Sequence, residues 1–90
     1  MIKVTLNGKN MNSKKRAHEY IKWKLKAEEY YGDNLDALWD VLSTYDRPTE
    51  ISFINMDSLI EALADYGESI VSVFKEASEE NENIKLGHIG

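Results

Sequence analysis

The chain has 90 residues, of which 42% are hydrophobic and 30% charged, with a net charge of −5 and no cysteine. This length predicts one small domain over residues 1–90, and the lack of cysteine excludes disulfides, thiol chemistry and the usual zinc sites. No apolar run approaches the ~18 residues of a membrane span, and the start MIKVTLNGKN lacks the apolar centre of a signal peptide. We therefore expect a soluble, cytoplasmic protein with no membrane contact.

The charge is distributed unevenly along the chain. Over residues 28–82, 15 acidic residues stand against Arg47 and Lys75 alone, whereas the rest carries nine basic residues and one acidic residue. A field this one-sided disfavours nucleic acid as a partner and favours a basic protein. A solvated acidic surface without a partner is the alternative interpretation.

The first third of the chain predicts a strand and a helix. Apolar residues alternate over residues 2–6 before an Asn-Gly turn pair, which is typical of a strand. Ser13 can cap a helix that runs to about Lys26. The predicted buried stripe of that helix contains Ala17, Tyr20, Ile21 and Leu25. Trp23 falls outside the stripe, so it either packs on lysine stems or makes an additional contact.

The same helix is basic. Lys14, Lys15, Arg16, Lys22, Lys24 and Lys26 could form a nucleic-acid surface, but a short basic stripe beside so much acid favours charge balance within the molecule. His18 and His88 lie far apart without the spacing of metal ligands, so we expect structural roles for both. We expect neither a metal nor a cofactor.

Residues 30–45 form the most informative segment. Asp33 or Asn34 can cap a helix from Leu35 to about Tyr45, and Gly32 gives the preceding backbone freedom. Leu35, Leu38 and Leu42 form one apolar stripe. Asp36, Asp40 and Ser43 cluster on roughly the opposite side, so both carboxylates face outward. Asp40 lies too far from the helix start for the helix dipole to explain it.

The second half predicts two more strands and two more helices. Pro48 precedes a strand over residues 50–54 whose apolar residues suggest a central position, and Asn55 can cap a short helix that ends near Gly67. A further helix begins at Glu68, and a polar turn at residues 81–83 leads to a last strand over residues 84–89. Strands separated by helices predict an α/β domain with a three-stranded parallel sheet and flanking helices.

The block YYGDNLDALWD at residues 30–40, with the following Val41 and Leu42, resembles the signature of the barstar family, the intracellular inhibitors of barnase-type ribonucleases. The resemblance continues more loosely through Pro48 and into residues 68–77. It implies the same three-stranded parallel fold. It also implies a protein that blocks the active site of a small basic secreted ribonuclease, at about one to one, and is a monomer when free.

The resemblance further implies a set of contact residues. In the family, the residue at the Asp40 position occupies the phosphate site of the nuclease, Asp36 lies at the contact, and Tyr30 supplies an aromatic contact while Tyr31 packs inward. The predicted partner-binding residues are Tyr30, Asn34, Asp36, Trp39, Asp40, Ser43, Tyr45 and Glu76.

Several of these residues have a second interpretation. Asn34 is favoured as a cap over a contact, and core and interface are equal alternatives for Trp39. Glu76 either pairs with the nuclease or is a solvated charge. Tyr45 departs from the tryptophan that barstar has at the matching place, although the position stays aromatic.

Three interpretations fit Asp36 and Asp40: solvated helix acids, a general acid–base pair, or a surface that mimics phosphates. The resemblance favours the third, because arginine binds carboxylates and phosphates in similar bidentate geometry. Two acids on one exposed helix face do not flank a cleft, which argues against an enzyme. The alternative function is a barstar-like immunity or adaptor protein that binds a different basic toxin or partner.

Overall fold

The computed structural model describes residues 1–28 and 32–90. Its strands are β1 (Ile2–Asn7), β2 (Thr49–Ile54) and β3 (Ile84–Ile89). Its helices are α1 (Lys14–Leu25), α2 (Leu35–Ser43), α3 (Met56–Leu63) and α4 (Asp65–Glu80), and a short 3-10 turn, η1 (Gly8–Asn10), follows β1. The predicted α/β fold is confirmed, with three parallel strands in an open sheet and four helices in the part of the chain that the structure describes.

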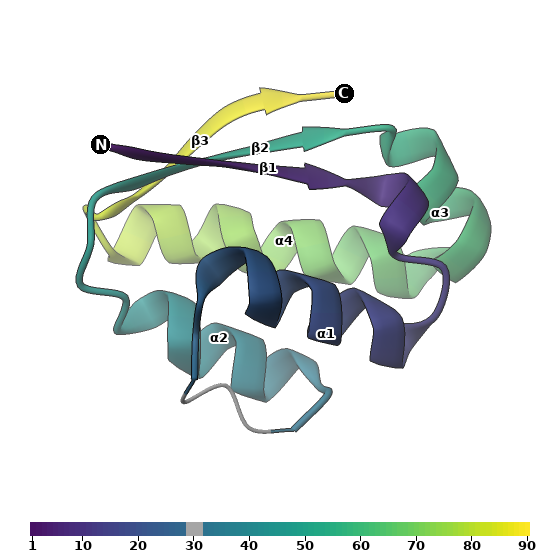
Figure 1. Cartoon of the computed structure of the whole chain (residues 1–90), viewed down its shortest axis with the longest axis horizontal. Helices are drawn as coiled ribbons and strands as arrows, with labels where there is room; N and C mark the ends of the chain where they lie inside the picture. Colours follow the sequence, from purple (N-terminus) through teal and green to yellow (C-terminus); the bar gives the residue numbers. More distant parts are fainter. Residues whose placement is uncertain (29–31) are drawn as a thin grey trace.

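The sheet has the order β1-β2-β3, and both strand pairs are parallel. Helices α1, α2 and α4 lie on one side of it and α3 lies at one end, so the other face of the sheet is open (Figure 1). On that open face Lys3 is paired in register with Glu50, and Glu50 with Lys85.

The core lies between the sheet and the helices. The predicted central position of β2 is confirmed, because Ile51 and Phe53 are fully buried and point toward the helices. The ring of Phe53 meets the ring of Phe74 on α4 edge to face, with centroids 5.2 Å apart. Aromatic pairs prefer this arrangement, which here joins the central strand to the longest helix.

Helix α1 begins as predicted. The hydroxyl of Ser13 accepts a hydrogen bond from the N–H of Arg16 at 3.1 Å. Such a cap satisfies one of the free N–H groups at a helix start. The predicted stripe is confirmed at Ala17, Ile21 and Leu25, which are buried, whereas Tyr20 is only partly buried.

Two predictions about helix ends are wrong. Asn55 precedes α3, but its backbone is left-handed (φ 54°) and its side chain makes no cap; its amide instead donates to the side-chain oxygen of Asn7 at 2.9 Å. Gly67 does not end a helix, because the break falls at Ala64 (φ 50°) and α4 begins at Asp65 rather than Glu68. A Cβ at Gly67 would lie 3.1 Å from the carbonyl oxygen of Leu59, so this glycine permits close packing of α4 on α3.

Within residues 1–28 and 32–90, no helix is both long enough and apolar enough to cross a membrane.

Candidate functional site

The start of α2 is fixed by its own sequence. The side-chain oxygen of Asn34 accepts a hydrogen bond from the N–H of Ala37 at 2.8 Å, which confirms Asn34 as the cap. Gly32 has a φ of +87°, a conformation that residues with a Cβ rarely adopt. A left-handed turn and a cap therefore orient α2 before its acidic residues begin.

Helix α2 has a buried face and an acidic face. Leu38, Val41 and Leu42 are buried, whereas Asp36 and Asp40 are exposed. The hydroxyls of Ser43 and Thr44 both donate to the main-chain carbonyl of Asp40, at 3.3 and 2.7 Å, so they leave its carboxylate free to face solvent. The predicted clustering of two outward carboxylates on one helix face is what the structure shows.

The two other aromatic residues of the predicted set behave differently. Trp39 is partly buried and packs against the core, so one part of its ring remains accessible. Tyr45 is only 7% exposed, and its hydroxyl donates to the carbonyl of Leu25 at 2.9 Å. Tyr45 therefore joins the end of α2 to the end of α1 and offers little surface to a partner, so we leave it out of the proposed contact set. Tyr30 and Tyr31 lie outside the described residues.

Glu76 lies on a different helix from the two aspartates. It is exposed on α4, and α4 packs against α2. The turn after α4 holds the two helices together: the side-chain amide of Asn81 donates to the carbonyls of Leu42 (2.8 Å) and Tyr45 (2.9 Å) at the end of α2. The sequence indicated only a polar turn here and gave no sign of this contact, which spans almost 40 positions.

We predict that Asn81→Ala lowers the free energy of unfolding by about 1–3 kcal/mol, because it removes a donor shared by two partly buried carbonyls. Asn83→Ala is the matched control, since Asn83 makes one longer bond to the Tyr45 carbonyl at 3.2 Å. Urea denaturation followed by circular dichroism measures both. An Asn83→Ala loss as large as that of Asn81→Ala would contradict this role for Asn81.

The sequence model of the family described as Barstar (barnase inhibitor) matches residues 1–88. This chain belongs to the barstar family. The chain is also 35% identical over 81 residues to a protein of Bacillus subtilis (strain 168) named "Putative ribonuclease inhibitor YrdF", and the match covers 89% of each chain. The acidic face of α2, which carries Asp36 and Asp40, is the candidate site of this barstar-family chain.

A buried histidine of this barstar-family chain lies between α1 and α4. His18 on α1 is 1% exposed, and its Nε2 lies 2.6 Å from the hydroxyl of Tyr66 on α4. Burial lowers the pKa of His18 below its ordinary value of 6.5, and the nearby Asp33 carboxylate opposes that shift. Burial and Asp33 both raise the pKa of Tyr66. Tyr66 therefore stays protonated and can donate to a neutral His18.

We predict that stability falls as the pH drops from about 7.5 to 5.5. The folded-state pKa of His18 is lowered, so the unfolded chain, with a pKa near 6.5, binds the proton first. The stabilising contribution is thus complete above 6.5 and is lost as the pH falls below it. Urea denaturation at several pH values gives the free energy of unfolding as a function of pH. This dependence should be weaker for His18→Gln than for the parent over the window, whereas His88→Gln, which changes an exposed histidine, should follow the parent. A parent curve flat across the window would be inconsistent with a buried neutral His18.

The described part of the chain contains no group of three or more His, Cys, Asp or Glu side chains that could hold a metal ion. The exposed carboxylates of Asp36 and Asp40 can accept hydrogen bonds and attract cationic groups.

Proposed function

We propose that this protein inhibits a small, basic ribonuclease of the barnase type by covering its active site with the acidic face of α2. Membership of the barstar family supports a ribonuclease inhibitor, and the pair of exposed carboxylates at Asp36 and Asp40 is the observation that carries the mechanism. The proposed complex is one to one, and the inhibitor acts in the cytoplasm of the cell that makes the nuclease.

The carboxylates would take the place of substrate phosphates. A ribonuclease grips RNA with arginine and lysine side chains, and an arginine fork binds a carboxylate in nearly the same bidentate geometry as a phosphate. Asp40 is central on the face, and the structure gives its carboxylate no role inside the described part of the fold. Asp36 and Asp40 are four positions apart, so their mutual repulsion costs the free helix about 0.2–0.5 kcal/mol. A cationic partner would relieve that repulsion.

The remaining contacts would surround these two carboxylates. Trp39 precedes Asp40 in the chain and is only partly buried, so it can supply apolar contact area. The proposed contact set is Tyr30, Asn34, Asp36, Trp39, Asp40, Ser43 and Glu76. Because inhibition works by occupying a site, the protein itself needs no catalytic group.

Titration against barnase, and against any small basic nuclease encoded beside this gene, tests the proposal. RNA cleavage should fall linearly and stop near one equivalent of inhibitor, and the inhibitor alone should cleave nothing. If no ribonuclease is inhibited but a different basic toxin is bound and neutralised, the function is that of an immunity protein for another toxin class. Turnover by the purified protein that disappears in Asp36→Asn or Asp40→Asn would show an enzyme instead.

We predict that Glu76→Ala slows association with the nuclease more than it speeds dissociation. Glu76 is exposed on α4, beside the helix that carries the two aspartates, so we expect it at the rim of the interface. Rim charges act mainly by steering a basic partner, and salt screens them with a Debye length of about 8 Å at 0.15 M. Stopped-flow association at low and high salt should show a smaller rate constant and a weaker salt dependence for the variant. An effect confined to dissociation would place Glu76 inside the interface.

A further inference from the structure

Strand β1 forms an edge of the sheet, and its outer side has no strand partner in the part of the chain that the structure describes (Figure 1). Ile2 donates its N–H toward β2. Because successive residues of a strand direct their main-chain groups to opposite sides, Lys3 and Thr5 direct theirs outward. The next outward group is already used, since the N–H of Asn7 donates to the hydroxyl of Tyr20 at 3.1 Å. The open edge is thus a short segment of two N–H and two C=O groups.

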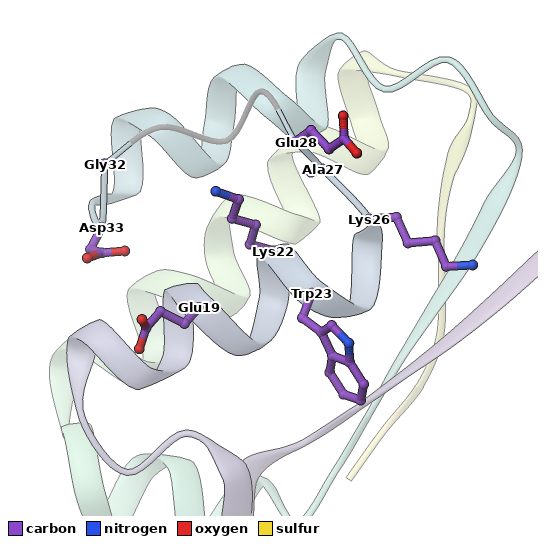
Figure 2. Close-up of a pocket in the computed structure, with 8 residues that line it drawn as sticks. All are labelled: Glu19, Lys22, Trp23, Lys26, Ala27, Glu28, Gly32 and Asp33. Carbon is purple, nitrogen blue, oxygen red and sulfur yellow. The ribbon is translucent and has the colours of Figure 1, made fainter.

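An exposed tryptophan stands beside this edge. Trp23 on α1 is 71% exposed, and Figure 2 shows its ring pointing away from Gly32 and Asp33, although all three residues line one hollow of about 720 Å³. It lies on a different helix from Asp36 and Asp40, the two exposed carboxylates of α2. The centroid of the Trp23 ring lies 6.3 Å from the centroid of the Tyr20 ring and 5.9 Å from the ammonium group of Lys24. Despite these two neighbours, most of the side chain is accessible.

A hollow of about 350 Å³ separates Trp23 from β1. It is lined by Ile2, Lys3, Val4, Trp23, Lys24 and Lys26. Ile2 is itself 42% exposed and faces the helical side of the strand, as Val4 does. Apolar surface therefore meets three lysines directly beside unpaired main-chain groups.

We propose that the β1 edge binds an extended acidic polypeptide segment, which adds a fourth strand to the sheet. Side chains alternate across a strand, so one apolar side chain of the added segment would enter the hollow against Trp23. Its carboxylates would pair with Lys3, Lys24 and Lys26. Main-chain hydrogen bonds supply affinity in this mode of recognition, and the side-chain pocket supplies specificity.

The hydrogen-bonding pattern favours a polypeptide over a nucleic acid. The outward groups of Lys3 and Thr5 include acceptors as well as donors, and a peptide backbone satisfies both, whereas phosphate oxygens only accept. The charge also argues against a second copy of this chain at the same edge, because two β1 edges would bring like-charged lysines together.

Selection of random linear peptides on the immobilised full-length protein tests the proposal. We expect the selected peptides to contain several acidic residues and an apolar residue that fits the hollow. Synthetic versions, measured by fluorescence anisotropy, should bind Trp23→Ala about 30-fold or more weakly than the parent, the loss expected for an anchoring aromatic. Lys24→Ala should lower the affinity for the peptide and reduce the dependence of that affinity on salt. Lys15→Ala removes the same charge from the same helix but outside the hollow, so it should change neither quantity.

N-methylated peptides test the added strand itself. Two versions of a selected peptide, methylated on alternate sets of residues, should differ: one set faces β1 and loses binding, and the other faces solvent and keeps it. Equal behaviour of the two would overturn the proposal. Selected peptides without acidic residues, or unchanged peptide binding by Trp23→Ala, would also overturn it. A thymidine oligonucleotide or anionic phosphatidylserine vesicles serve as the other ligand classes. If one of these binds in a way that depends on Trp23 and no acidic peptide does, the proposal is wrong.

Peptide binding at the β1 edge does not depend on ribonuclease inhibition, and the variant Trp23→Ala distinguishes the two activities. This exposed substitution should leave the circular dichroism spectrum, the unfolding midpoint and ribonuclease inhibition as in the parent. Loss of inhibition in a folded Trp23→Ala protein would assign Trp23 to the nuclease interface and overturn a separate site.

Discussion

Asp40→Ala should weaken binding to the inhibited ribonuclease by about 2–5 kcal/mol, the loss typical of removing one partner of a buried charge pair, for which the barnase–barstar complex is itself a worked example. The physical reason is that the basic groups of the nuclease active site would lose their carboxylate partner after desolvation. The fold should be unaffected, because Asp40 is exposed and alanine is the better helix former. Equilibrium titration by inhibition, together with a urea denaturation curve, measures the two effects separately.

Two further variants identify charge as the cause. Asp40→Asn keeps the size of the side chain and should lose most of the same affinity. Glu61→Ala removes one negative charge from the exposed surface of α3, away from α2, and should leave affinity nearly unchanged. An Asp40→Ala protein that inhibits as tightly as the parent would refute the assignment of Asp40, even if inhibition itself is real.

Phe74→Ala should lower the free energy of unfolding by about 3–5 kcal/mol, a large share of the 5–15 kcal/mol typical of a domain. Phe74 is fully buried on α4, and its ring packs edge to face on Phe53 of β2. Removing it would leave a cavity between the central strand and the helix that carries Glu76. Urea denaturation followed by circular dichroism measures the loss.

Phe74→Leu retains most of the apolar volume and should cost less, which keeps the comparison measurable if the alanine variant is largely unfolded. Val73→Ala, at the adjacent and only partly buried position, should cost less than Phe74→Ala. A loss below about 1 kcal/mol for Phe74→Ala would mean that the sheet and α4 depend little on this contact.

Some features of this protein follow from neighbouring residues alone. The caps at Ser13 and Asn34 were predictable because a cap bonds a backbone N–H only three positions ahead. The shared face of Asp36 and Asp40 follows from helical periodicity, and the central position of β2 from its apolar residues. For the two caps and the shared helix face the sequence is sufficient, since the interacting groups lie within a few residues of one another.

Other features depend on contacts between distant segments. Tyrosine is common in interfaces, but the hydroxyl of Tyr45 donates a buried hydrogen bond to the carbonyl of Leu25, 20 positions away. His18 is buried beside Tyr66, 48 positions away. The helix break falls at Ala64, and Gly67 instead lies within α4 where that helix packs closely on Leu59 of α3.

The candidate site combines both kinds of information. The sequence by itself determined which residues of α2 face outward, because a helix repeats every 3.6 residues whatever surrounds it. Only the tertiary structure decided that α4 lies beside α2, because the two helices are joined by hydrogen bonds from Asn81 to carbonyls at the end of α2, almost 40 positions earlier in the chain. It also decided that Trp23 stands exposed beside an open strand edge, since packing of α1 against the sheet sets which side of that helix remains uncovered.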